Sequence, residues 1–89
     1  MKIIFTPLAM EQWGYWKKTN PNIAKRIKNI LLDMREHPYT GIGKPEPLKY
    51  DLTGKWSRRI NEEHRIVYSV NDDRVEIDIL TMRHHYSKK

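Results

Sequence analysis

The architecture follows mainly from residues 56–82, which read WSRRINEEHRIVYSVNDDRVEIDILTM. In this segment three stretches rich in β-branched or aromatic residues are separated by two polar stretches, which is the pattern of an antiparallel meander. We predict strands at 56–60, 65–70 and 74–82. The turns between them are the polar stretches Asn61-Glu62-Glu63-His64 and Asn71-Asp72-Asp73.

The residues before the meander predict one strand and two helices. Residues 2–6 are strand-like and stop at Pro7, and residues 8–18 favour a short helix. A second helix is indicated by the N-cap Asn20, which Pro21 follows. Its apolar stripe consists of Ile23, Ile27, Ile30, Leu31 and Met34.

This second helix must end at Pro38, and residues 39–49, rich in Gly and Pro, favour a structured loop. The order strand, helix, helix, loop and meander predicts an α+β fold with both helices on one face of an antiparallel sheet. We expect one domain over residues 1–89, of which 87–89 form a short basic tail.

Alternation along the strands gives the sheet two unlike faces. Ile66, Tyr68 and Val70 are assigned to the helix face, and Arg65, Val67 and Ser69 to the other. If Ile60 also faces the helices, Ser57 and Arg59 lie beside Arg65. For Arg59 and Arg65 to share a face, the connection between their strands must have an odd number of residues or contain a bulge. The four residues 61–64 do not satisfy this, so we expect a bulge or an odd-length connection there.

The last strand has Val75, Ile77 and Ile79 on its predicted core face. Regular alternation then assigns His85 to that face, and His84 to the opposite face with Leu80 and Met82. We expect the strand to bend or leave its ladder near Arg83, because both histidines are polar and close to the end.

Charge is the most informative feature of the composition. The 89 residues carry a net charge of +6 and contain no cysteine, and the pI is about 9.7. Such a surface attracts polyanions, of which nucleic acid is the commonest in a cytoplasm. No stretch approaches the roughly 20 apolar residues of a membrane span. We therefore expect a cytoplasmic protein with no membrane partner.

Four linked segments resemble the YoeB toxins, which belong to the wider RelE/ParE fold group. They are Gly43–Lys49 (GKPEPLK), Leu52–Ile60 (LTGKWSRRI), Glu62–Tyr68 (EEHRIVY) and the pair His85-Tyr86. The resemblance implies a RelE-like fold and a toxin that is a metal-independent endoribonuclease acting on messenger RNA in the ribosomal A site. It also implies a YefM-like antitoxin as partner, and it is compatible with a homodimer.

The same resemblance assigns roles to individual residues. Glu46 matches the general base, Arg65 a phosphate-binding arginine and His85 the general acid. The RNA-binding residues that it implies are Lys49, Arg59 and Tyr86. Two features depart from the family pattern: Ser87-Lys88-Lys89 follow the His-Tyr pair, and His84 stands where a tyrosine is common, so two imidazoles compete for the acid role.

These residue types suit metal-free RNA cleavage. The reaction needs a base for the 2′-hydroxyl, an acid for the leaving 5′-oxygen and cations for the phosphate oxygens. Histidine titrates near neutrality without help, and arginine donates forked hydrogen bonds to phosphate. We expect no cofactor and no metal, because adjacent histidines point apart on a strand and no third ligand is evident.

Each of these residues also has a structural interpretation. Taken alone, Glu46 could be a loop charge, Arg65 a solvated strand residue, and His85 a surface histidine. His64 is interpreted as structural or merely exposed, and Trp13 and Trp16 as packing residues. The rival functions are a ParE-like gyrase poison on the same fold and a plain RNA- or ribosome-binding module without acid–base chemistry.

Overall fold

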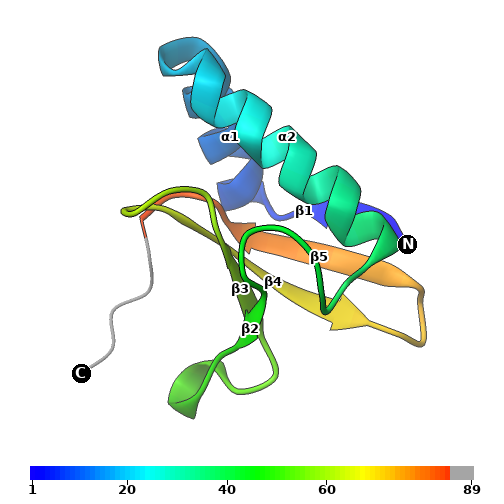
Figure 1. Cartoon of the computed structure of the whole chain (residues 1–89). Coiled ribbons are helices and arrows are strands. Elements are labelled where there is room, and N and C mark those ends of the chain that lie inside the picture. The colour runs from blue at the N-terminus through cyan, green and yellow to red at the C-terminus, as the bar shows by residue number, and fades with distance from the viewer. Residues whose placement is uncertain (85–89) are drawn as a thin grey trace.

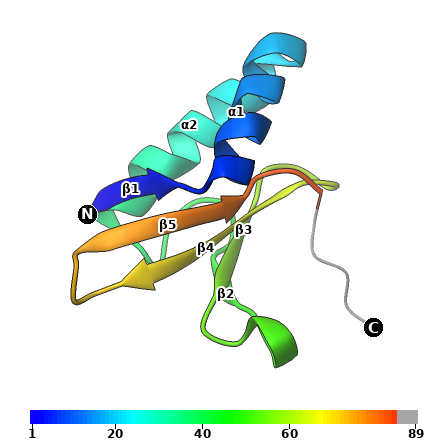
Figure 2. The same ribbon diagram turned by 180° about the vertical axis from the view of Figure 1, so that it is seen from behind.

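The computed structural model describes residues 1–84, and His85 and Tyr86 lie outside these described residues. Its elements are β1 (Lys2–Phe5), α1 (Pro7–Thr19), α2 (Pro21–Glu36), β2 (Glu46–Pro47), the 3-10 turn η1 (Tyr50–Leu52), β3 (Trp56–Arg59), β4 (Arg65–Asn71) and β5 (Glu76–Thr81). Both helices cover the same face of the sheet (Figures 1 and 2). The predicted α+β architecture is confirmed.

Helix α2 begins at Pro21 as predicted, α1 begins at Pro7, one residue before its predicted start, and each helix has a side-chain cap. Thr6 caps α1, because its Oγ1 accepts a hydrogen bond of 3.1 Å from the N–H of Ala9. Asn20 caps α2 in the same way, through its Oδ1 and the N–H of Ile23 at 3.2 Å. Such caps each contribute about 1 kcal/mol. Helix α2 ends at Glu36, ahead of Pro38, as predicted.

The sheet has the strand order β1-β5-β4-β3-β2. It differs from the predicted sheet in two details. Strand β1 runs parallel to β5, so the sheet is mixed; the sequence pattern had assigned no neighbour to the N-terminal strand. Glu46 and Pro47, predicted within a loop, pair with Ser57 and Trp56 and form the short edge strand β2.

The core lies between the helices and the sheet. It is formed by fully buried side chains from both layers, namely Ile27, Ile30, Met34, Ile66, Tyr68, Ile77, Ile79 and Met82. Each buried aliphatic side chain contributes roughly 1.5–3 kcal/mol. Trp16 is buried here, and Trp13 and Trp56 pack against the same cluster, so the predicted packing role of Trp13 and Trp16 is confirmed.

Strand β5 corrects the predicted alternation. Val67 pairs with Thr81 but the next residue, Tyr68, pairs with Ile79, so Leu80 is an extra residue in a bulge. A bulge shifts the faces of the residues that follow it. Met82 was predicted to face away from the core and is instead fully buried in it.

The start of the same strand was also predicted wrongly. Val75 was assigned to the core face, but it is 57% exposed and lies before β5 in a tight turn. Its φ of 57° is in the left-handed region, and its N–H donates to the carbonyl of Asp72. The turn therefore takes two residues, Arg74 and Val75, that the apolar pattern had given to the strand.

Among residues 1–84, no helix is long and apolar enough to span a bilayer.

Candidate active site on the open face of the sheet

The face opposite the helices, here called the open face, carries the predicted site residues that the structure describes. Arg58 points to the helices and contacts Asp33 of α2, so its neighbours Ser57 and Arg59 in β3 point to the open face. Glu46 pairs with Ser57 across β2 and β3, and therefore shares this face. Glu46 and Arg59 are exposed, whereas Ser57 is buried.

Arg59 and Arg65 lie directly opposite one another in the β3–β4 pairing. Five residues, 60–64, connect the two strands, so the predicted odd-length connection is confirmed. Both arginines thus stand side by side on the open face, with strands about 4.8 Å apart. Like charges directly opposite destabilise a sheet. This pair is therefore a concentrated positive site next to the exposed Glu46 carboxylate.

The side chain of Arg65 is held by the hairpin connection. Its Nη1 donates to the carbonyl of Asn61 at 2.7 Å and to that of His64 at 3.1 Å. Within residues 1–84 its Nη2 and Nε make no hydrogen bond. An arginine whose guanidinium is anchored in this way is suited to donating forked hydrogen bonds to a phosphate.

Lys49 completes the described part of the predicted site. It follows β2 at the start of η1 and is exposed. In the described part of the chain, Lys49, Glu46 and Arg59 form no ion pair. Within residues 1–84, therefore, none of these three charges is paired with an opposite charge.

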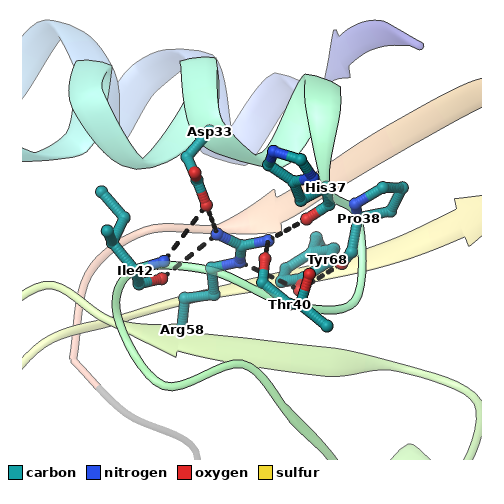
Figure 3. Close-up of polar contacts among 7 residues, drawn as sticks. All are labelled: Asp33, His37, Pro38, Thr40, Ile42, Arg58 and Tyr68. Atoms are coloured by element: carbon teal, nitrogen blue, oxygen red, sulfur yellow. Dashed lines mark hydrogen bonds and ion pairs between the residues drawn. The ribbon is translucent and has the colours of Figure 1, made fainter.

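Arg58, which the sequence analysis left unassigned, fixes the loop that leads to Glu46 (Figure 3). Its side chain is fully buried, and all five of its N–H groups have acceptors. Nη1 donates to the Asp33 carboxylate at 2.7 Å and to the Ile42 carbonyl at 3.1 Å. Nη2 donates to the carbonyls of His37 and Thr40.

The same cluster continues through Tyr68. Arg58 Nε donates to the Tyr68 hydroxyl at 3.2 Å, and that hydroxyl donates to the Pro38 carbonyl at 2.9 Å. Burial raises the pKa of Tyr68 above its usual value of 10, and it outweighs the opposing effect of the hydrogen bond from Arg58. The hydrogen bond from Arg58 lowers the pKa of Asp33 below its usual 3.8.

Two glycines permit this packing. Gly41 has a φ of 116°, and a Cβ there would lie 1.9 Å from the Asp33 carboxylate oxygen. Gly43 has a φ of 81°, and its carbonyl accepts the N–H of Arg59 at 2.6 Å. The loop is thus bonded to α2 and β3 up to three residues before Glu46. The Gly-rich composition could have indicated a tightly folded loop, and the alternation that assigns Ser57 and Arg59 to the open face leaves Arg58 on the helix face. No sequence pattern indicated which loop carbonyls Arg58 would bind.

The described chain ends beside Arg65. The N–H of Arg65 donates to the His84 carbonyl at 2.9 Å. His84 is exposed and has a φ of 62°, so the chain has left the regular ladder, as predicted, although β5 already ends at Thr81. Because of the bulge, the alternation that favoured His84 as the acid does not apply. The predicted positions His85 and Tyr86 follow immediately, outside the described residues.

Among residues 1–84, no three His, Cys, Asp or Glu side chains are grouped so that they could bind a metal ion. His64, interpreted from sequence as structural or exposed, is buried.

Comparisons with known proteins identify the family. The family model for the YoeB-like toxin of bacterial type II toxin–antitoxin systems matches residues 5–86. Toxin YoeB of Escherichia coli O6:H1 is 48% identical over 97% of this chain and 100% of its own length. A YoeB/ParE toxin from Agrobacterium tumefaciens superposes with a TM-score of 0.92 at 36% identity, covering 97% of this chain and 100% of the other.

Structures from Staphylococcus aureus agree. A YoeB–YefM complex matches at 42% identity and a YoeB dimer at 41%, each with a TM-score of 0.86 over 97% of this chain and 98% of that one. Each of these matches covers nearly the whole chain. The chain therefore belongs to the YoeB family of toxins from bacterial type II toxin–antitoxin systems.

Proposed function

We propose that this toxin is a metal-independent endoribonuclease that cleaves messenger RNA in the ribosomal A site and thereby inhibits translation. The observation that carries the proposal is the pair of opposed arginines, Arg59 and Arg65, on the same face as the exposed Glu46 carboxylate. A phosphate between the two guanidinium groups relieves their repulsion. Membership of the YoeB family supports the same interpretation.

In this reaction the 2′-hydroxyl of a nucleotide attacks the adjacent phosphorus, and the bond from phosphorus to the 5′-oxygen breaks. Glu46 takes the proton of the 2′-hydroxyl, and His85 gives a proton to the leaving 5′-oxygen. The products are a 2′,3′-cyclic phosphate and a 5′-hydroxyl. Arg65 and Arg59 donate hydrogen bonds to the phosphate oxygens, whose negative charge grows in the transition state. One well-placed donor of this kind is worth roughly 3–4 kcal/mol.

Lys49 and Tyr86 bind RNA outside the reacting atoms. Lys49 is exposed beside β2 and provides a positive charge for a neighbouring phosphate. Tyr86, next to the proposed acid, provides an aromatic ring on which a base can stack. Neither residue exchanges a proton in the reaction, so their loss affects binding more than the chemical step.

The partner that silences the toxin is a YefM-like antitoxin with an acidic segment that folds over the open face. The net charge of +6 and the opposed arginines Arg59 and Arg65 on this face favour such a segment. The S. aureus YoeB–YefM complex supports the antitoxin, and the S. aureus dimer supports a homodimer of this chain. The proposed substrate and ribosome place the protein in the cytoplasm.

Cleavage by the purified protein tests the function. Free RNA is incubated with the protein in excess EDTA, and messenger RNA bound to ribosomes is incubated with it in ordinary magnesium buffer. We expect cuts that leave cyclic phosphate and 5′-hydroxyl ends in at least the ribosomal reaction. Binding without any cut would indicate a plain RNA- or ribosome-binding module. Inhibition of gyrase without RNA cleavage would indicate a ParE-like poison.

A further inference from the structure

The turn between β3 and β4 is closed by hydrogen bonds, two of which are accepted by the side chain of Asn61. The Asn61 Oδ1 accepts the N–H groups of Glu63 at 2.9 Å and His64 at 2.7 Å. The carbonyl of His64 accepts the N–H of Ile60 at 2.9 Å, which closes the hairpin. A short connection with these bonds holds His64 in one position.

From this turn the His64 side chain reaches the last described part of the chain. The imidazole is buried, and it lies edge-on to Trp16 with ring centroids 4.7 Å apart. Its Nδ1 accepts the backbone N–H of His84 at 2.6 Å. Because Nδ1 accepts, the proton of the neutral ring is on Nε2, which lies 3.7 Å from Glu63 Oε1. Trp16 Nε1 in turn donates to the Met82 carbonyl at 2.8 Å.

The same turn also holds Arg65. The carbonyl of His64 accepts a hydrogen bond from Arg65 Nη1, and the Arg65 N–H donates to the His84 carbonyl. Both backbone polar groups of His84 are therefore bonded to residues 64 and 65. The chain that continues into His85 starts from a point fixed next to the proposed phosphate-binding arginine.

We propose that His64 is a positioning residue for RNA cleavage: its imidazole fixes the backbone at His84 beside Arg65, and so fixes the point from which the chain continues to the proposed acid, His85. This inference rests on the proposed function, in which His85 is the general acid. A shift of about 1 Å in a reacting group can lower a rate by roughly 100-fold without weakening binding. In this role His64 acts through the backbone at His84 and exchanges no proton with the substrate.

The alternative role for His64 is that of a core residue that only fills space beside Trp16. Shape and hydrogen bonding can be separated by substitution. His64→Phe keeps an aromatic ring against Trp16 but removes the acceptor for the His84 N–H. His64→Asn loses the ring but places an amide oxygen near the position of Nδ1. His37→Phe, at an exposed histidine after α2, is the matched control.

The test combines kinetics on ribosome-bound messenger RNA with NMR measurement of amide hydrogen exchange at His84. We expect His64→Phe to lower kcat roughly 10- to 100-fold with KM nearly unchanged, and to speed exchange at His84. His64→Asn should recover most of kcat and of the protection, and His37→Phe should match the wild type. If His64→Phe does not fold, His64→Gln, whose amide lies near Nε2 instead, replaces it in the comparison with His64→Asn.

The inference is overturned if His64→Phe, which lacks the acceptor, keeps the wild-type kcat. It is also overturned if His64→Phe and His64→Asn lose kcat equally and in proportion to their loss of Tm. Failure of the proposed function gives a different result, namely a wild-type protein that cleaves no RNA. In that case amide exchange at His84 still tests whether His64 fixes the backbone there. Faster exchange in His64→Phe but not in His64→Asn supports this role, and unchanged exchange in His64→Phe overturns it.

Discussion

Arg58 and Arg59 are neighbours in β3, yet they occupy opposite environments. The Arg58 side chain is fully buried on the helix face, and its donors are all used by α2, the following loop and Tyr68. Arg59 is exposed on the open face, opposite Arg65, and forms no ion pair within residues 1–84. Two neighbouring residues of the same charge can therefore have different roles: Arg58 stabilises the fold, and Arg59 is exposed where the proposed RNA contact lies.

The same division applies to the two faces of the sheet. A buried ion pair is costly to break, because the remaining charge is left without a partner in a poorly solvated place. An exposed charge contributes little to stability and is free to bind an anion. We therefore expect substitutions on the helix face to act through folding, and substitutions on the open face to act through RNA.

The largest effect is expected for Arg58. Replacing it with methionine, of similar length, leaves the Asp33 carboxylate and several loop carbonyls without their donor, and should lower the free energy of unfolding by about 3–5 kcal/mol. Arg59→Met, one residue later, should change it by less than about 0.5 kcal/mol. Urea denaturation followed by circular dichroism measures both. Equal losses in the two variants would remove the distinction between the faces.

The next effect concerns the two histidines at the end of the chain. His85→Gln should lower cleavage by roughly 100-fold or more, because the leaving oxygen loses its acid. His84→Gln should cost far less, since the structure engages the backbone of His84 in its hydrogen bonds to His64 and Arg65. Single-turnover cleavage is measured for both, with circular dichroism as the folding control. The reverse ranking would identify His84 as the acid.

The pH dependence of stability tests the contact between Arg58 and Asp33 on the helix face. The hydrogen bond from Arg58 lowers the pKa of Asp33 below 3.8 in the folded chain. A carboxyl with a lowered folded pKa stabilises the fold above its unfolded pKa, and this contribution is lost as pH falls through the folded value. The wild type should therefore lose stability from about pH 4 downward. The Asp33→Asn variant should have a lower free energy of unfolding at neutral pH, and in this acid range its free energy of unfolding should change less with pH than that of the wild type. Urea denaturation measures both. Parallel curves of unfolding free energy against pH would contradict the coupling between Asp33 and Arg58.

The smallest effects are expected for single RNA-binding charges on the open face. Arg59→Gln and Lys49→Gln should each weaken RNA binding several-fold and lower the slope of log Kd against log salt by about one. Lys25→Gln, on an exposed position of α2, is the control and should change neither quantity. Fluorescence anisotropy with a short RNA measures both. A control that weakens binding as much as Arg59→Gln would indicate attraction by net charge alone.

Periodicity predicted the helices, the meander and the side-by-side placement of Arg59 and Arg65, because these depend on local alternation and the length of one turn. It failed at Leu80 and Val75, where a bulge and a left-handed turn residue interrupt a regular apolar pattern. It could not find the role of Arg58 or His64 either. The roles of Arg58 and His64 depend on backbone atoms that are distant in the sequence, and residue types alone do not predict such contacts. The assignments of Glu46, Arg65 and His85 came from the family resemblance.

We propose that the open face carries out the RNA cleavage and contributes little to the stability of the fold, and Glu46→Gln tests this most directly. The substitution keeps the shape of the side chain and removes the base, so cleavage of ribosome-bound messenger RNA should fall by roughly 100-fold or more. The free energy of unfolding should stay within about 0.5 kcal/mol of the wild type, as it should in the exposed control Glu62→Gln, which should cleave normally. Wild-type cleavage by Glu46→Gln would contradict the claim.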